Sequence, residues 1–165
     1  MQRVLGIDPG SRITGYGLVE LPDSRLEPTL LEAGVIRLDT TLSLEDRVQQ
    51  LYGDLGDLLE ELKPTRVAIE KLYAHYRHPR TAILMGHARG VILLCARQRG
   101  LPIENVPATA VKKALTGYGH ASKEQIQRAV QSQCRLDKLP SPPDVADAIA
   151  IALTDARRVA LAGRL

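Results

Sequence analysis

The chain contains 165 residues, of which 44% are hydrophobic and 25% are charged, as is ordinary for a globular protein. No apolar run approaches the ~20 residues that a membrane-spanning helix needs, and no signal peptide opens the sequence, so we expect neither a membrane protein nor a secreted one. Cys95 and Cys134 lie far apart and lack metal-ligand spacing. They favour free thiols in a reducing compartment, and we expect a cytoplasmic protein whose residues 1–165 form one domain.

Charge is distributed unevenly along the sequence. Residues 1–70 contain 7 Lys/Arg and 13 Asp/Glu, a balance of −6, whereas residues 71–140 contain 12 and 3, a balance of +9. The remaining residues balance at 3 and 3. A middle segment so poor in acids indicates a surface for a polyanion, although ordinary solvated helix faces would give the same pattern.

The first predicted element is a buried strand from Val4 to Asp8, which a Pro-Gly turn follows. Asp8 therefore emerges at the carboxyl end of a strand, where open α/β sheets place their functional sites. An aspartate before Pro-Gly is also good turn chemistry, so bracing the turn is the competing interpretation. This stretch alone does not decide between the two.

The turn after Asp8 is expected to join the first strand to a second over residues 13–20, and residues 30–38 are expected to form a third antiparallel strand. The hydrophobic period then changes to that of a helix, which Ser43 caps and Pro64 ends. The remaining predicted elements are strands over residues 66–70 and 101–106 and helices over residues 80–98, 109–115, 122–134 and 144–153.

Three more acids stand at informative positions. Glu70 repeats the pattern of Asp8, because it ends a short apolar strand. Asp144 and Asp147 lie three residues apart, and therefore on one face, of the nearly apolar last helix. A structural interpretation makes Asp144 the helix N-cap and Asp147 its partner one turn further on. It does not explain why two strand-end acids accompany them.

Asp8, Glu70, Asp144 and Asp147 together would form an oxygen-only site, whose mutual repulsion is on the order of several kcal/mol unless cations compensate it. Such hard ligands suit Mg²⁺ or Mn²⁺, whereas no His or Cys spacing supports Zn²⁺. Two such ions about 4 Å apart can activate a water and stabilise the leaving oxygen of a phosphodiester. Nearby basic loops would hold the phosphates. The pattern therefore predicts a nuclease in which these four acids bind metal and are catalytic.

Four separated motifs resemble the RuvC family of bacterial Holliday-junction resolvases, in the same order and at the same chain length. They are Gly6 to Gly17, Ala68 to Glu70, Gly86 to Gly90 and Asp144 to Ala152. The resemblance implies an RNase H-like fold, in which helices flank a five-stranded mixed sheet. It also implies a homodimer that acts in DNA recombination and repair by cutting opposing strands of a four-way junction symmetrically, leaving 5′-phosphate and 3′-hydroxyl ends.

The resemblance also implies roles for individual residues. The family's metal-binding acids fall on the same four carboxylates, with two Mg²⁺ per subunit that Mn²⁺ can replace. Its two junction-contacting lysines fall on Lys112 and Lys123, and the aromatic that stacks near the crossover falls on Tyr73, where phenylalanine is more usual. The RuvA–RuvB branch-migration complex is a candidate partner. The other residues expected to bind DNA are Arg77, Arg80 and Lys113.

Several residues keep two interpretations at this stage. Arg89 either binds DNA or a second subunit, or packs its aliphatic stem in the core. Tyr118, between two glycines, stacks on a ligand or covers a loop. The small residues Gly86, Ala88 and Gly90 suit the close packing of another helix, which a second subunit could supply.

Three other functions share some of these features. An actin-like ATPase fragment also begins with a strand, an aspartate and a Gly-rich turn, but that fold clamps its nucleotide between two domains. A ribonuclease H-type enzyme that cuts RNA–DNA hybrids would share the metal site, although the spacing of the acids fits the resolvase better. A structural DNA-binding protein would explain the basic segment but not four converging acids. We therefore expect a Mg²⁺-dependent junction resolvase.

Overall fold

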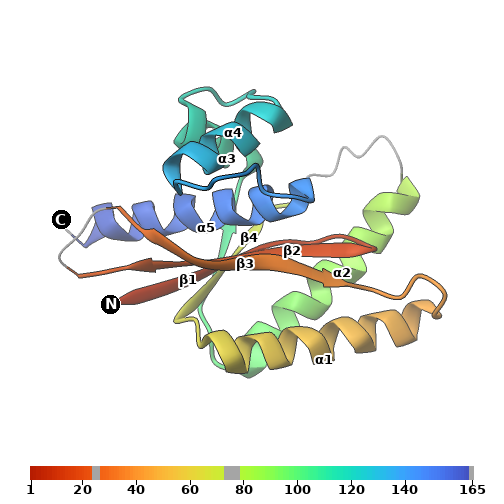
Figure 1. Cartoon of the computed structure of the whole chain (residues 1–165). Coiled ribbons are helices and arrows are strands. Elements are labelled where there is room, and N and C mark those ends of the chain that lie inside the picture. Colours follow the sequence, from red (N-terminus) through yellow and green to blue (C-terminus); the bar gives the residue numbers. More distant parts are fainter. Residues whose placement is uncertain (24–26, 73–78, 164–165) are drawn as a thin grey trace.

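The computed structural model describes residues 1–23, 27–72 and 79–163 of the chain. A five-stranded sheet lies at its centre in the order β3-β2-β1-β4-β5, with helices on both faces (Figure 1). No helix in these ranges is both long and apolar enough to cross a membrane. The strands are β1 (Gln2–Asp8), β2 (Ile13–Leu21), β3 (Thr29–Arg37), β4 (Arg66–Glu70) and β5 (Ile103–Val106). The helices are α1 (Leu44–Leu62), α2 (Pro79–Gln98), α3 (Ala108–Thr116), α4 (Lys123–Gln133) and α5 (Pro143–Ala162).

The sheet is mixed, as expected. β1, β2 and β3 are antiparallel neighbours, whereas β4 runs parallel to β1 and β5 runs parallel to β4. The three antiparallel strands follow one another along the chain, and the parallel strands are reached through α1 and α2. Parallel neighbours end at the same edge of a sheet, so the carboxyl ends of β1 and β4 lie together.

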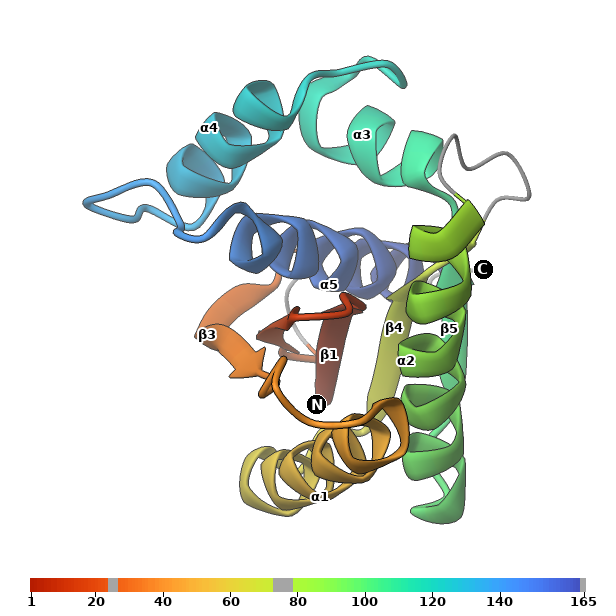
Figure 2. The ribbon, with the colours of Figure 1, turned by 90° about the vertical axis from the view of Figure 1, so that its right-hand side faces the viewer.

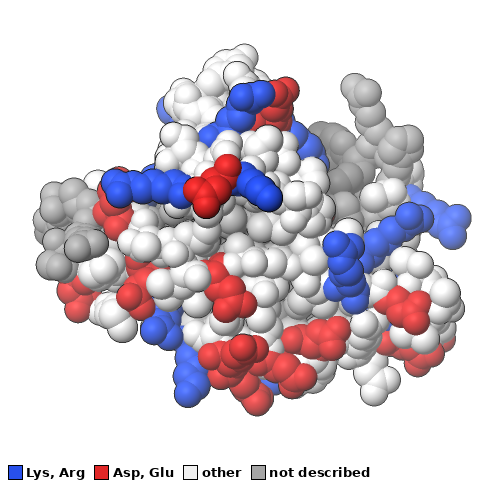
Figure 3. All heavy atoms as spheres, viewed as in Figure 1, with Lys and Arg blue, Asp and Glu red and all other residues white. Residues whose placement is uncertain are grey.

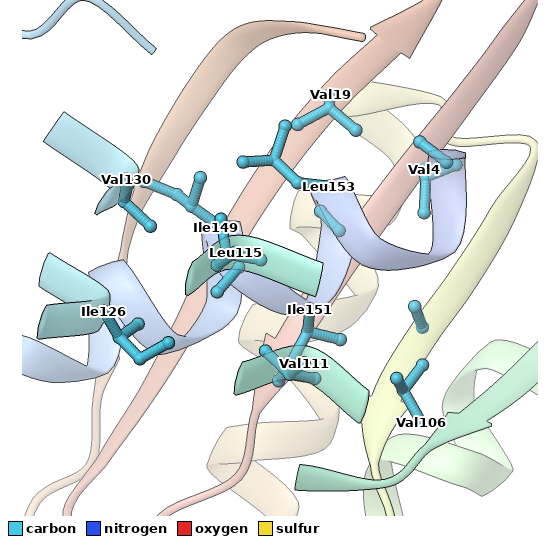
Figure 4. Close-up of a cluster of buried hydrophobic side chains, with 14 of the residues drawn as sticks. Val4, Val19, Val106, Val111, Leu115, Ile126, Val130, Ile149, Ile151 and Leu153 are labelled. Atoms are coloured by element: carbon cyan, nitrogen blue, oxygen red, sulfur yellow. The ribbon is translucent and has the colours of Figure 1, made fainter. Parts of the chain in front are cut away.

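Two hydrophobic cores hold the layers together. α1 and α2 cover one face of the sheet, α5 covers the other, and α3 and α4 lie outside α5 (Figure 2). Consecutive residues of β1 point to opposite faces, so Val4 belongs to the core under α5 and Leu5 to the core beside α1 and α2. Figure 4 shows the first of these cores, where Ile149 and Leu153 of α5 meet side chains of the sheet, α3 and α4. The continuous apolar run of β1 is explained by burial on both faces.

α5 lies against the backbone of β1 and β2, with glycines at the contact. A Cβ at Gly6 would lie 2.6 Å from the backbone nitrogen of Ala152, and a Cβ at Gly17 would lie 2.9 Å from the Cα of Ile149. Real Cβ contacts are longer than this, so only glycine fits without displacing the helix. This close approach fixes where the first turn of α5 stands relative to the end of β1.

The helix caps agree with the sequence at two helices and differ at a third. Ser43 caps α1, because its hydroxyl oxygen accepts a backbone N–H at 3.2 Å, and Ser122 begins α4 with a complete capping box. At α5 the interpretation of Asp144 as the N-cap is wrong, since Pro142 occupies that position and makes no side-chain cap bond. The carboxylate of Asp144 is therefore available for another role.

The small residues of α2 differ in what they contact within the described chain. Ala88 is buried in the core beside α1 and α2, as its place on the inner face of the helix requires. A Cβ at Gly86 or at Gly90 would meet nothing within 4 Å among the described residues. No helix of the described chain therefore packs closely against these two glycines.

Gly6→Ala tests the approach of α5 to β1. The new methyl group would collide with helix backbone, which cannot rotate away, so the free energy of unfolding should fall by roughly 3 kcal/mol. Gly53→Ala is the matched control, because Gly53 is exposed on α1 with nothing within 4 Å of its Cβ position. This control should gain up to about 1 kcal/mol from better helix propensity. Urea unfolding measures both, and equal stabilities would contradict the proposed packing constraint.

Candidate active site

The strand pairing places two acids next to each other. β1 and β4 are parallel, and Ile7 lies opposite Ile69 in their register. The next residues, Asp8 and Glu70, are the last of their strands and leave the sheet at the same edge. The pattern of a strand ending in an acid, seen twice in the sequence, thus corresponds to one place in the fold.

The first turn of α5 reaches the same edge. Gly15 of β2 pairs with Asp8, and a Cβ at Gly15 would lie 2.6 Å from the carbonyl carbon of Asp144. The helix therefore begins directly above the end of β1, with Asp147 one turn further along. All four acids line one pocket of about 560 Å³: Asp8, Glu70, Asp144 and Asp147.

Positive side chains complete the wall of this pocket. Lys112 of α3 and Lys123 of α4 line it, and so does Arg12 in the turn after β1. The amine of Lys123 lies 3.8 Å from a carboxylate oxygen of Asp147. The pocket thus combines clustered acids with cations on separate elements, which is an arrangement suited to a phosphate ester and its counter-ions.

Burial, and after it the neighbouring acids, raise the pKa values of three of the four carboxylates. Burial, followed by the charges of Asp147, Glu70 and Asp144, raises the pKa of Asp8 to about 8, and Lys123 acts in the opposite direction. Burial and then Asp147 also raise the pKa of Glu70. The pKa of Asp147 is raised chiefly by burial, against which Lys123 acts. The lysines therefore compensate only part of the negative charge, and the pocket favours additional cations.

The donor set fits hard divalent cations, although the side chains are not gathered around one point. As they stand, no group of three or more His, Cys, Asp or Glu side chains in the described ranges is arranged to hold a metal ion. The chemistry of the four carboxylates, oxygen only and with excess negative charge, is that of Mg²⁺ or Mn²⁺ ligands.

The turn after β1 does not depend on the side chain of Asp8. Within this turn, which the structure describes in full, the Thr14 hydroxyl lies 3.5 Å from both the N–H and the carbonyl oxygen of Gly10. The carbonyl of Arg12 accepts the N–H of Leu38 at 2.9 Å. The carboxylate of Asp8 makes none of the turn's hydrogen bonds, so the geometry favours a role in the pocket over bracing the turn.

The residues expected to bind DNA fall into three groups. Lys112 and Lys123 line the pocket, whereas Lys113 and Arg80 are exposed and do not line it. Tyr73 lies outside the described residues, and so does Arg77. The structure thus brings two of the six to the carboxylates.

Arg89 has a contact that sequence analysis missed. Its Nε donates to the backbone carbonyl oxygen of Glu70 at 3.2 Å, and its guanidinium also donates to the side-chain oxygen of Asn105. The guanidinium therefore ties α2 to the ends of β4 and β5 and helps hold the strand end that carries Glu70. No sequence signal could have revealed this, because the acceptor on Glu70 is a backbone carbonyl.

Comparisons with known proteins agree with this geometry. A family model described as crossover junction endodeoxyribonuclease RuvC matches residues 4–155. The protein of that name from Rhodopirellula baltica is 47% identical over 150 residues, which are 91% of this chain and 83% of the relative. The one from Heliobacterium modesticaldum is 42% identical over 150 residues, covering 91% of each chain.

A solved structure shares the fold along almost the whole chain. T. thermophilus RuvC in complex with Holliday junction substrate superposes with a TM-score of 0.89 at 33% identity, covering 98% of this chain and 97% of the other. The RNase H-like α/β fold expected from the sequence is thereby confirmed. With a family model that matches nearly the entire sequence and relatives above 40% identity, the chain belongs to the crossover junction endodeoxyribonuclease RuvC family.

Proposed function

We propose that this chain is a structure-specific endonuclease that resolves four-way DNA junctions by paired symmetric nicks. The observation that carries the proposal is the single pocket in which four carboxylates from β1, β4 and α5 face lysines from α3 and α4. A relative with the same fold was solved with a Holliday junction, which favours a junction over an RNA–DNA hybrid as substrate. We infer that residues 1–165 work as one domain and, with both cysteines free, in the cytosol.

The proposed cofactor is Mg²⁺, two ions per subunit, for which Mn²⁺ can substitute. Asp8, Glu70, Asp144 and Asp147 would hold the ions, which when bound supply activation of the attacking water and stabilisation of the leaving oxygen. Lys112 and Lys123 would hold the phosphates beside the carboxylates. Asp8 ends a strand and Asp144 and Asp147 stand on the first turns of a helix, so regular secondary structure carries these carboxylates. They can therefore bind a phosphodiester and its metal ions without reordering of the backbone.

The charge distribution supports a defined approach of DNA. Acidic side chains gather over α1 on the lower face of Figure 3, on the opposite side of the sheet from α5. The lysines that line the pocket stand on α3 and α4, beyond α5. A polyanion is therefore expected to meet the α3–α4 side. The exposed acids of α1 are Glu45, Asp46, Asp54, Asp57, Glu60 and Glu61.

The outer face of α2 supports the homodimer expected from the sequence. Ile83 and Leu94 are 62% and 53% exposed, and three helical turns separate them on one face. Gly90 lies between them on this face, with nothing within 4 Å of its Cβ position. An exposed apolar stripe with a glycine at its centre suits close packing against a second copy of α2. Coupled action with the RuvA–RuvB complex stays a prediction of the family resemblance.

Cleavage of three substrates tests the proposed function. The protein is incubated with a mobile four-way junction, a linear duplex and an RNA–DNA hybrid, with and without Mg²⁺. Paired symmetric nicks confined to the junction, leaving 5′-phosphates and requiring the metal, are the expected result. Preferential cutting of the hybrid would instead assign the chain to the ribonucleases, and ATP turnover without cleavage would assign it to the ATPases.

Asp8→Asn is expected to abolish junction cutting, with a fall of at least about 10³-fold, because a neutral amide cannot replace a carboxylate that binds metal. Junction binding should persist, since the lysines remain. Asp57→Asn, an exposed aspartate on α1, is the matched control and should cut normally. Gel assays of cutting and binding measure both properties, and cutting by Asp8→Asn near the wild-type rate would refute the site assignment.

The raised pKa of Asp8 predicts how stability depends on pH without divalent metal. A carboxyl whose pKa rises from 3.8 to about 8 on folding stabilises the folded state below the lower value, and this contribution is lost as pH rises towards the upper one. In EDTA, Asp8→Asn should therefore melt roughly 3–6 °C above the wild type at pH 8, with a smaller gap at pH 5. Thermal melts across this range measure the gap, and a gap independent of pH would contradict the assignment.

Ile83→Glu tests the dimer. A buried, unpaired carboxylate within the proposed interface is costly, so the variant should be monomeric at micromolar concentration while the wild type is dimeric. Leu161→Glu is the matched control, because Leu161 is 63% exposed at the other end of the fold on α5. Light scattering after size exclusion gives the masses. A dimeric Ile83→Glu protein would place the interface elsewhere.

A further inference from the structure

The loop between α3 and α4 presents two aromatic side chains to solvent. Tyr118 is 59% exposed, and its ring lies 5.6 Å from the ring of His120, with an angle of 66° between their planes. The hydrophobic cores of the described chain do not include either side chain. Packing within the fold therefore does not explain why a large ring stands here.

The backbone of this loop is held in one conformation. Gly117 ends α3 in the left-handed region, at φ 78°, and its N–H donates to the carbonyl of Lys113 at 2.8 Å. The N–H of Tyr118 donates to the Thr116 hydroxyl at 3.1 Å. The carbonyl of Tyr118 accepts the N–H of the buried Ala121 at 3.2 Å. A ring on such a backbone needs little further ordering to bind a ligand.

The loop joins the two helices that form the basic wall of the candidate active site, although Tyr118 and His120 do not line the pocket itself. It connects the two helices whose lysines line the pocket (Figure 2), and Lys123 follows the buried Ala121 by two residues. A Cβ at Gly119 would lie 3.6 Å from the carbonyl oxygen of Thr109, so the loop folds back along α3. Thr109 directly follows Ala108, which also lines the pocket. The aromatic pair is thus part of the same helical hairpin that forms the basic wall.

The surrounding chemistry selects nucleic acid as the partner. The segment from Asn105 to Lys123 contains three lysines and no acid. Lysines that hold a phosphate backbone next to an exposed aromatic ring are the combination that binds unpaired nucleotides, because every base has a face that can stack. A protein partner would be favoured by a wider apolar patch, whereas the neighbours here are glycines, a histidine and lysines.

We propose that Tyr118, supported at its edge by His120, stacks on an unpaired nucleobase of the junction next to the phosphate held by Lys112 and Lys123. The contact rests on the proposed function and gives the pocket a means of distinguishing a junction from a duplex. Bases in a continuous duplex are stacked on each other and cannot offer a free face. Bases at a crossover can leave their stack, so the ring adds binding energy only there.

Junction and duplex affinities of ring variants test this contact. Tyr118→Ala should weaken binding to a four-way junction by about 5- to 100-fold, and Tyr118→Phe, which keeps the ring, should stay within about two-fold of wild type. Duplex binding should not change in either variant. Leu31→Ala is the control for loss of an exposed apolar side chain, because Leu31 is 46% exposed on the edge strand β3. Affinities are measured by fluorescence anisotropy in EDTA, where no cutting is expected.

Two further readouts separate stacking from charge and from misfolding. The slope of log affinity against log salt should not change in Tyr118→Ala, whereas Lys123→Ala should reduce its magnitude by about 1. A 2-aminopurine at the crossover should be quenched by the wild type and by Tyr118→Phe but not by Tyr118→Ala. The melting temperature of Tyr118→Ala should stay within about 2 °C of wild type, since the ring is exposed.

Several outcomes would overturn the contact. They are an unchanged junction affinity in Tyr118→Ala, an equal loss on junction and duplex, or a loss in Tyr118→Phe as large as in Tyr118→Ala. These results remain distinct from failure of the proposed function. A wild-type protein that neither prefers nor cuts the junction would remove that function, whereas a junction-cutting protein indifferent to Tyr118→Ala would remove only the stacking contact.

Discussion

The contact between the backbone of α5 and the glycines of β1 and β2 is the constraint on which the site depends. Gly6 and Gly15 leave no side chain between sheet and helix, so the first turn of α5 stands directly over the end of β1. A glycine inside a strand costs roughly 0.5–1 kcal/mol in chain entropy relative to alanine. That cost is offset by the buried alanine- and isoleucine-rich face of α5. Two acids on a helix thereby join two acids on strands, although more than 130 residues of chain separate Asp8 from Asp144.

The pocket is an arrangement that stability alone would not select. Burial and mutual repulsion disfavour the charged forms of Asp8, Glu70 and Asp147. Each ionised carboxylate therefore has a higher free energy in the folded chain than in water. Such conflicts between local chemistry and folding concentrate at functional sites. Burial also raises the pKa of Asp155, but this carboxylate lies 2.7 Å from the Nε of Arg66, which acts in the opposite direction. That ion pair ties α5 to β4 towards the opposite end of the helix from Asp144 and Asp147.

Much of this architecture could be predicted from the sequence, because its signals are local. Period, caps and turn residues predict each strand and helix of the described chain, although the predicted last helix ends at Leu153 and α5 continues to Ala162. The sequence also predicts that Asp8 and Glu70 each end a strand, but only the sheet pairing shows that the two strands are parallel neighbours. The cap of α5 was misjudged because aspartate is a better capping residue than proline, yet a proline at the first helical position has no N–H that needs a cap. The charge pattern of the sequence does not distinguish Lys112, which lines the pocket, from Lys113, which does not. The packing of α3 on α5 determines which of the two lysines lines the pocket.

The charge asymmetry between α1 and the α3–α4 pair affects how the molecule meets DNA. The acidic helix α1 and the basic pair α3–α4 lie on either side of the sheet and give the protein a charge asymmetry, although α2 beside α1 carries three arginines and no acid. In the field of a polyanion a dipole experiences a torque, so the pocket is turned towards the DNA before any contact forms. A larger fraction of encounters is then productive than the small net charge of +3 would suggest. Because salt screens this torque, the association rate should fall with ionic strength even where the final complex is held by stacking.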